Sequence, residues 1–302
     1  MIMGHSISDT DAFGAAIGIY CAARVLGKKA QIVLDQVTSS LRPLKEGFTT
    51  EKGYPPDMFV SSERALELTD YNTLVMVVDV NRPSHTECPG LLKRTDSIVV
   101  FDHHRQSSEV ISNPVLSYIE PYASSTCEMV AEVLQYFTEN IKLAPHEADC
   151  IYAGILIDTS NFMTKTGVRT FEAAAYLKRC GAEVTRVRKM LRNDMDAYKA
   201  RAEVVRHAEV YRGAFAISIC PADKIESPTI VGAQAADELL NIVGIKASFV
   251  LTEYQGKIYV SSRSIDEINV QKIMERLGGG GHLNMAGCQL RDCTVSQAQR
   301  II

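Results

Sequence analysis

Long apolar runs, paired cysteines and an excess of positive charge are all missing from this 302-residue sequence. No apolar run reaches the ~18 residues that a membrane span requires, and we find no signal peptide. The eight cysteines form no C-x-x-C pair, so a zinc site built from cysteine pairs is not expected. Scattered cysteines in a chain of this size are typical of reduced thiols, and we therefore expect a cytoplasmic chain with no membrane contact of its own.

The net charge of -4 provides no basic field that could hold a long nucleic acid. A short or small anionic substrate stays open, because a local metal ion or arginine cluster can outweigh a mildly acidic surface. The length suggests about two domains. Internal repeats and low-complexity tracts are also missing.

The first part of the chain alternates short apolar runs with amphipathic segments. The runs at 73–80 and 97–104 are almost continuously apolar, as expected of strands covered on both faces. The segments at 11–27, 124–137 and 145–158 have helical spacing. This alternation predicts an α/β domain over residues 1–190, built on a parallel, doubly wound sheet.

The pattern changes after a highly charged stretch that we interpret as a linker helix over residues 191–212. Residues 213–302 then read as a smaller α/β domain with a mixed sheet. Its strongest signal is a hairpin at 246–264, with a turn at "YQGK". A helix at 269–277 runs into four glycines, and "HLNMAGCQL" after them resembles the start of another helix.

Acidic and imidazole side chains follow four apolar segments of the first domain. In an open parallel sheet the carboxyl ends of the strands face the ligand crevice, so we expect these residues to meet at one edge. They are His5, Asp9 and Asp11, then Asp79, then Asp102, His103 and His104, and finally Asp158.

Four of these carboxylates, those of Asp9, Asp11, Asp79 and Asp158, would carry a charge of -4 if ionised. Packed together they would repel one another, and two divalent cations would remove the conflict. Mixed aspartate and histidine ligands suit manganese, iron or zinc. Asp79 is central enough to bridge two ions, and such a dimetal site is suited to phosphoryl transfer.

A single aspartate after a strand is most often a helix cap or a loop carboxylate, and we assign Asp35 to that class. The joint occurrence of His-x-x-x-Asp-x-Asp, an isolated Asp, Asp-His-His and a further Asp is much less expected by chance. We therefore favour a metal site.

The second domain offers an anion-binding candidate. Glycine runs let a backbone come close to a ligand, although they also occur as flexible linkers. Arginine is suited to bidentate phosphate contact, although a lone arginine is usually a surface charge. We expect these residues to form an anion clamp that faces the metals across a cleft between the domains. The candidates are Ser262, Arg263, Gly279, Gly280, Gly281 and His282.

The motifs "HSISDTD", "VVDV", "FDHH" and "ILIDTSNF" resemble, in order, those of the DHH phosphoesterase superfamily. "SSRS" and "GGGGH" resemble the DHH-associated substrate domain that follows. The segments "VISNPVLSYIEPYASSTCEMVAEVLQY" and "INVQKIMERLGGGGHLNMAGCQL" are similar to cyclic di-AMP phosphodiesterases of the GdpP type. One departure is Ser8, which stands where the family often has proline.

The resemblance implies a role for each matching residue. One manganese would be held by His5, Asp9 and Asp79, and the other by Asp11, Asp79, His103 and Asp158. His104 would lie beside the substrate phosphate and Asp102 behind it. Arg263, the glycine run and His282 would hold the nucleotide.

The resemblance also implies hydrolysis of cyclic di-AMP to linear pApA, with Asp79, His104 and Arg263 in catalytic roles, and a homodimer. Full-length relatives carry two membrane helices, a PAS domain and a degenerate GGDEF domain before this module, which would anchor it on the cytoplasmic side of the membrane. Alternatives are a nanoRNase or pAp phosphatase of the same superfamily and a nucleotide-sensing module without activity. A family II pyrophosphatase is disfavoured, because no Lys-rich motif follows "SSRS".

Overall fold

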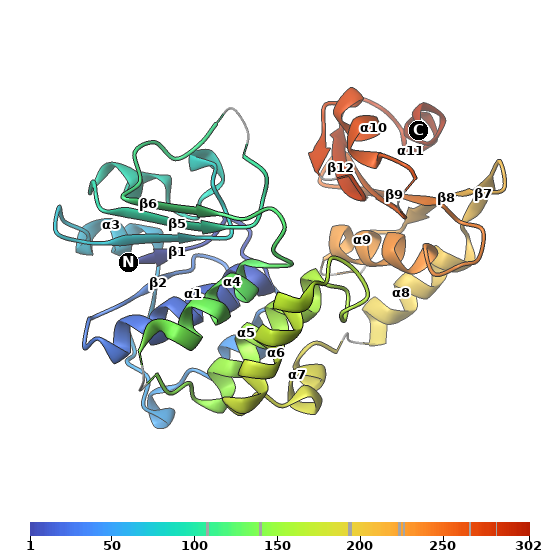
Figure 1. The fold of residues 1–302 in the computed structure, drawn as a ribbon. Coiled ribbons are helices and arrows are strands. Elements are labelled where there is room, and N and C mark those ends of the chain that lie inside the picture. Colours follow the sequence, from blue (N-terminus) through green and yellow to red (C-terminus); the bar gives the residue numbers. More distant parts are fainter. Residues whose placement is uncertain are drawn as a thin grey trace. The chain divides into compact units, whose positions relative to one another are not determined.

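The chain forms two compact units in a computed structural model (Figure 1). The units span Met1–Arg192 and Asn193–Ile302. The structure describes residues 1–106, 109–138, 141–192, 195–222, 225, 227–265, 267–281 and 283–302. In these described parts, no helix is both long and apolar enough to span a bilayer.

A six-stranded parallel sheet is the centre of the first unit. Its strands are β1 (Ile2–Met3), β2 (Ile32–Val33), β3 (Phe59–Val60), β4 (Val75–Val78), β5 (Ile98–Asp102) and β6 (Leu116–Ile119). They lie in the order β3-β2-β1-β4-β5-β6, and every pair is parallel. The chain therefore proceeds outward in one direction from β1 and in the other from β4. A ligand crevice is expected where the direction changes, at the carboxyl ends of these two strands.

Helices α1, α4 and α5 lie on one face of this sheet (Figure 1). The helices of the unit are α1 (Thr10–Val25), α2 (Arg42–Lys45), α3 (Ser62–Leu68), α4 (Thr126–Phe137), α5 (Pro145–Asp158), α6 (Val168–Arg179) and α7 (Val184–Met190). Short 3-10 turns occupy Thr50–Lys52, Pro83–His85 and Pro89–Lys93. The doubly wound parallel fold predicted from the sequence is confirmed.

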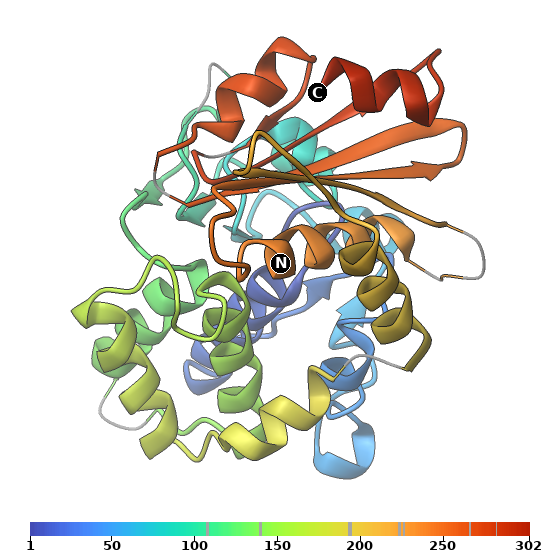
Figure 2. The same ribbon diagram turned by 90° about the vertical axis from the view of Figure 1, so that its right-hand side faces the viewer.

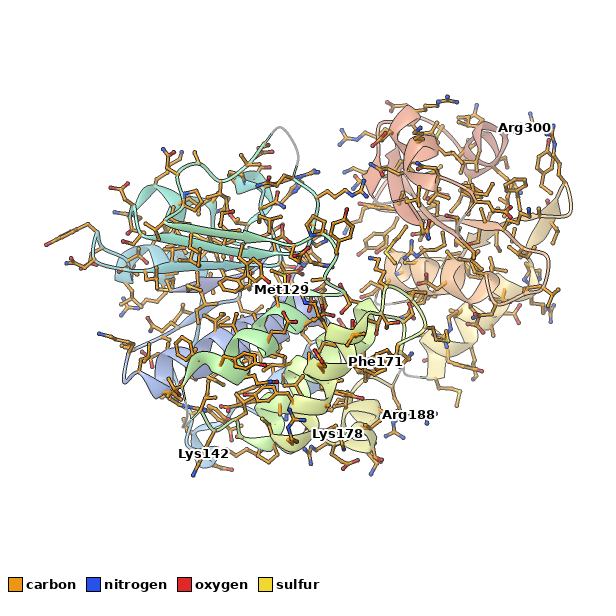
Figure 3. All side chains as sticks on the ribbon, in the orientation of Figure 1. Met129, Lys142, Phe171, Lys178, Arg188 and Arg300 are labelled. Carbon is orange, nitrogen blue, oxygen red and sulfur yellow. The ribbon has the colours of Figure 1, made fainter. Side chains whose placement is uncertain are left out.

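Apolar cores form on both faces of the sheet, which is why its strands read as continuous apolar runs. Val78 belongs to the core that includes α1, α4 and α5, whereas Val75 and Val77 belong to the core on the α3 side. In Figure 3, Met129 of α4 lies in the interior, and it is fully buried. Lys142 and Lys178, labelled in the same view, lie at the surface.

The second unit contains a mixed six-stranded sheet between two pairs of helices (Figure 2). Its strands are β7 (Glu209–Tyr211), β8 (Phe215–Cys220), β9 (Ala247–Tyr254), β10 (Lys257–Ser264), β11 (Gly280–Gly281) and β12 (Met285–Leu290), in the order β11-β12-β10-β9-β8-β7. Only β8 and β9 pair in parallel among these strands. Its helices are α8 (Met195–Arg206), α9 (Pro228–Leu239), α10 (Val270–Arg276) and α11 (Val295–Ile301). Helices α8 and α9 contribute to the core on one face of the sheet, and α10 and α11 to the core on the other.

Two local expectations for this part of the chain are wrong. "HLNMAGCQL" does not begin a helix, because Met285–Leu290 is strand β12, which pairs with β10 along its whole length. Strand β7 occupies residues assigned to the linker helix. There, Arg212 and Gly213 take left-handed backbone angles (φ 49° and 70°) and turn the chain into an antiparallel pair with β8.

Candidate metal and phosphoester site

Six side chains predicted as metal ligands converge at the carboxyl ends of β1, β4 and β5. His5 follows β1, Asp79 follows β4 and His103 follows β5, whereas Asp9 and Asp11 lie at the start of α1. Asp9 is the N-cap of α1, and its Oδ1 accepts from the backbone N–H groups of Asp11 and Ala12 at 3.0 Å each. Asp9 can therefore cap α1 and also serve as a metal ligand.

The helix predicted over 145–158 is confirmed as α5, but the grouping of Asp158 with residues at strand ends is wrong. It is the last residue of helix α5. The apolar run just before Asp158 is therefore a buried stretch of helix and does not belong to the sheet. The helix nevertheless delivers Asp158 to the same site, where its Oδ2 lies 3.3 Å from His103 Nε2.

Asp79 joins two groups of potential ligands. Its Oδ2 lies 3.6 Å from His5 Nε2, which in turn is 3.5 Å from Asp9 Oδ1. Its Oδ1 lies 3.4 Å from His103 Nε2. The ligand atoms of His5, Asp9 and Asp79 fall within 4.8 Å of one another, and so do those of Asp11, His103 and Asp158. Each oxygen of Asp79 thus faces a different group, as a bridging carboxylate would.

The backbone of Asp79 has a left-handed conformation, with φ 62°. This region disfavours most residues with a Cβ atom but tolerates aspartate, and strain of order 1–3 kcal/mol is characteristic of functional sites. The Asp79 N–H is still paired, since it donates to Phe101 O on β5 at 2.8 Å. The turn therefore ends β4 without leaving an unpaired amide.

The amino end of α4 holds two of these carboxylates. The N–H groups of Thr126 and Cys127 donate to Asp11 Oδ2 and Oδ1, at 2.7 and 2.9 Å. The Thr126 hydroxyl donates to Asp79 Oδ1 at 2.9 Å. The sequence indicated only a Ser/Thr helix start here, and nothing in it showed that Thr126 reaches across to the end of β4.

The protein side chains alone make the electrostatics of this site unfavourable for ionised carboxylates. Burial, together with the charges of Asp11 and Asp9, raises the pKa of Asp79 well above its ordinary value, and the same causes raise the pKa of Asp158. Burial lowers the pKa of His103, although the Asp11 carboxylate opposes that shift. Bound cations would lower these carboxyl pKa values again and would coordinate a neutral imidazole, so they would offset the repulsion among the carboxylates.

His103 supplies an independent test of whether a metal fits. Its Nε2 is buried, and it makes no hydrogen bond within the part of the chain that the structure describes. Carboxylate oxygens of Asp11, Asp79 and Asp158 surround it at 3.3–3.9 Å. A buried nitrogen with a lone pair among carboxylates is costly unless it binds a metal or a proton, so the residues present fit a divalent cation.

His104 is held differently from His103. Its Nδ1 lies 2.7 Å from Asp102 Oδ1, and its backbone N–H donates to the same oxygen at 3.1 Å. Because a carboxylate only accepts, Nδ1 carries the proton. Asn81, which the sequence analysis missed, donates from Nδ2 to Asp102 Oδ2 at 2.5 Å and to His104 O at 3.3 Å. Asp102 therefore orients the ring of His104 and is itself held by an amide.

Arg263 of the second unit forms an ion pair on its own sheet. Its Nε lies 2.6 Å from Asp237 Oδ1 of α9, and its NH1 donates to Ser262 O at 3.0 Å. Ser262 is fully buried, and its hydroxyl donates to Ala286 O at 2.8 Å. In this geometry Ser262 supports the strand that carries Arg263, and its own hydroxyl is engaged within the sheet.

The glycine run has structural reasons at most of its positions. A Cβ on Gly279 would lie 2.1 Å from Gly287 O, and one on Gly281 would lie 2.4 Å from Met285 O, so β11 presses against β12. Gly278 has φ 76° and ends α10. Gly280 is different, because a Cβ there would meet nothing within 4 Å. His282 lies outside the described residues.

Comparison with known proteins gives the site a family. A model of the DHH family, N-terminal domain, matches residues 1–155, just over half of the chain. The chain belongs to the DHH family. A model of the DHHA1 domain matches residues 215–302. Of the six predicted ligands, Asp158 alone lies beyond the DHH match, and it closes the site from the end of α5.

Two curated relatives of this DHH chain differ in how they match it. The cyclic-di-AMP phosphodiesterase GdpP of Geobacillus thermodenitrificans is 41% identical over 304 residues, which cover 99% of this chain and 46% of the relative. The chain thus spans about half the length of that relative. The bifunctional oligoribonuclease and PAP phosphatase NrnA of Thermus thermophilus is 25% identical, and the match covers 98% of this chain and 86% of the relative.

A solved structure shares the DHH fold. The crystal structure of an exopolyphosphatase-related protein from Bacteroides fragilis superimposes with a TM-score of 0.85, at 19% sequence identity. The match covers 99% of this chain and 89% of that one. At this identity the likeness supports the architecture of both domains and says nothing of the substrate.

Proposed function

We propose that this chain is a metal-dependent phosphodiesterase that hydrolyses cyclic di-AMP to linear pApA. The observation that carries the proposal is the position of Asp79, whose two oxygens face two separate groups of potential ligands. The substrate is supported by the 41% identity to a protein named as a cyclic-di-AMP phosphodiesterase. We propose the same cyclic di-AMP phosphodiesterase activity for any longer protein that contains this chain.

The donor set supports two divalent cations, and manganese is our proposed occupant. One ion would be held by His5, Asp9 and Asp79, and the other by Asp11, Asp79, His103 and Asp158. When bound, two such ions would lower the pKa of a water molecule and offset the negative charge on the phosphate. A set of carboxylate and imidazole donors without sulfur favours manganese, iron or zinc over softer metals.

The protein's own residues would position the phosphodiester and its leaving group. Attack of water at phosphorus breaks the bond to the ribose 3′ oxygen, which leaves with a proton as a hydroxyl, and the linear product keeps a 5′ phosphate. His104, oriented by Asp102, would stabilise the charge that builds on phosphorus. To bind the substrate, Arg263 would have to release Asp237 and pair with a phosphate. Charge-assisted hydrogen bonds to the phosphate would compensate for the lost ion pair.

The second domain is proposed to hold the nucleotide through Arg263, the glycine run and His282. Domain bounds of 1–190, 191–212 and 213–302, a homodimer, and a membrane anchor outside this chain remain predictions. The main alternative is a nanoRNase or pAp phosphatase, which the more distant match to NrnA keeps open. A nucleotide sensor without activity is disfavoured, because all six potential ligands are present.

Product analysis tests the substrate assignment. The protein with manganese is incubated separately with cyclic di-AMP, cyclic di-GMP, pApA and pAp, and the products are separated by chromatography. We expect the fastest turnover with cyclic di-AMP and accumulation of pApA. Faster cleavage of pApA or pAp than of cyclic di-AMP would contradict the proposal in favour of the alternative.

The Asp79→Ala variant tests the dimetal assignment. Removal of the proposed bridge should abolish metal-dependent hydrolysis and lower the number of manganese ions bound, because each half of the site loses a ligand. Isothermal titration of the metal and initial rates measure the two effects separately. Near-normal turnover by this variant would exclude a role for Asp79 as the bridge.

A further inference from the structure

Thr126 touches two candidate ligands that come from two other elements. Its backbone N–H donates to Asp11 Oδ2 of α1 at 2.7 Å, and its hydroxyl donates to Asp79 Oδ1 after β4 at 2.9 Å. The residue is fully buried. Its hydroxyl is therefore directed at a carboxylate rather than at solvent.

The start of α4 does not need this hydroxyl for capping. Ser125 is the N-cap, and its own hydroxyl accepts from the N–H of Glu128 at 3.0 Å. Thr126 is the first residue inside the helix, where a side-chain hydroxyl has no capping duty. The bond from Thr126 to Asp79 thus lacks an explanation from helix formation alone.

The bond fixes the plane of the Asp79 carboxylate. Oδ1, which accepts from Thr126, is the oxygen that lies 3.4 Å from His103 Nε2, and Oδ2 is the oxygen that faces His5. Rotation of the carboxylate would break the bond and turn each oxygen away from its group. The neighbouring His103 Nε2 is buried and lacks a hydrogen-bond partner among the described residues, so the oriented oxygen lies beside a nitrogen that is available to a metal ion.

We propose that Thr126 is a positioning residue for the two cations. Its hydroxyl holds Asp79 in the bridging orientation, while the first N–H groups of α4 hold Asp11. This inference rests on the proposed function, because it assigns Thr126 a role toward the same two ions. Outer partners of this kind typically change metal affinity by roughly 10- to 100-fold when they are removed.

The test compares metal binding in three variants of the whole chain. Thr126→Val removes the hydroxyl and keeps the shape, whereas Thr126→Ser keeps the hydroxyl. Thr170→Val is the matched control, because the buried Thr170 hydroxyl donates to the buried Glu128 carboxylate at 2.6 Å, which is not one of the six potential ligands. Manganese affinity and stoichiometry are measured by isothermal titration, and magnetic coupling between the two ions by electron paramagnetic resonance.

We expect Thr126→Val to weaken manganese binding by roughly 10- to 100-fold and to reduce the coupling between the ions. Thr126→Ser should restore both, and Thr170→Val should match the wild type in both while its unfolding midpoint falls about as much as that of Thr126→Val. Unchanged manganese affinity in Thr126→Val, or an equal loss of affinity in Thr170→Val, would overturn the role of Thr126 and leave the proposed function standing. A wild-type protein that binds no manganese would overturn the proposed function itself.

Discussion

At the scale of single residues, Glu147 shows how this fold accommodates a buried charge away from the site. The side chain is fully buried on α5, and it forms an ion pair with Arg24 of α1. Its oxygens also accept from the Tyr54 hydroxyl at 3.0 Å and from the Ala144 N–H at 2.7 Å. Burial alone would raise the pKa of Glu147, but Arg24 and the Ala144 N–H hold it below its ordinary value.

Glu147→Gln should therefore destabilise the protein at neutral pH and matter less in acid. A carboxyl whose folded pKa is depressed contributes stability above its unfolded pKa, about 4.3, and loses it as the pH falls through the folded pKa. We expect a loss of about 2 kcal/mol in the free energy of unfolding at pH 7, since Arg24 is partly exposed. Urea denaturation at pH 7 and pH 3.5 measures this difference.

The control for this comparison is Glu172→Gln, which changes an exposed glutamate on α6. It should follow the wild type at both pH values. A difference between Glu147→Gln and the wild type that is as large at pH 3.5 as at pH 7 would show that the stabilisation does not come from the ionised carboxylate.

At the scale of elements, the four residues of the glycine run, Gly278 to Gly281, serve local structure at three positions and are free of packing constraints at the fourth. Gly279 and Gly281 are required by the contact of β11 with β12, and Gly278 by the end of α10. Gly280 faces open space and has no such structural reason among the described residues. Because packing does not require glycine at Gly280, the remaining reason for a glycine there is the close approach of a ligand to the backbone.

Alanine substitutions separate these two kinds of position. Gly279→Ala should lower the free energy of unfolding by about 2 kcal/mol or more, because its Cβ would overlap Gly287 O and Cys288 Cβ. Gly280→Ala should change stability by less than about 0.5 kcal/mol but raise KM for cyclic di-AMP about tenfold. Thermal unfolding and initial rates measure the pair. Gly280→Ala with normal KM would remove Gly280 from the substrate site.

At the scale of the whole molecule, each unit has its own cores, and all six potential metal ligands belong to the first. Cations that bind the native state alone stabilise the unit that holds them. Arg263 and the glycine run lie in the second unit, so metal binding and nucleotide binding are proposed to start on different units.

Manganese should therefore protect the two units unequally from hydrogen exchange. At a concentration of 100 times the dissociation constant, amides near Asp11, Asp79 and Thr126 should exchange up to about 100-fold more slowly, because their opening must release the ions. Peptides from Asn193–Ile302 should be unchanged. Mass spectrometry of exchanged peptides, with Asp79→Ala as control, measures both; protection confined to the second unit would contradict the assignment of the ligands.

Much of the fold and of the site was predictable, because the signals were local. β4 and β5 are covered on both faces and read as apolar runs, and polar residues after them mark the edge at which the potential ligands converge. Helix α5 was predicted from its spacing, but Asp158 was grouped with residues at strand ends, because the apolar run before it resembles the runs that precede Asp79 and His103. β12 was mistaken for a helix, since its short run after a glycine segment has no clear period and its pairing partner is distant in sequence.

The residues that sequence reasoning missed share one property. Each of them forms a hydrogen bond to a residue far away along the chain, and its residue type does not predict that partner. These residues are Thr126, Asn81 and Asp237. Thr126 lies 47 positions from Asp79, and its type at a helix start is ordinarily explained by capping.

Residue type, period and order are enough to predict the parallel sheet, the potential ligands and the family motifs. They do not show which oxygen of Asp79 faces which histidine, which hydroxyl holds that carboxylate, or that Arg263 pairs with Asp237. These are matters of direction and distance between separate elements. Such contacts are fixed by how helices and strands pack, and no local pattern of residues records them.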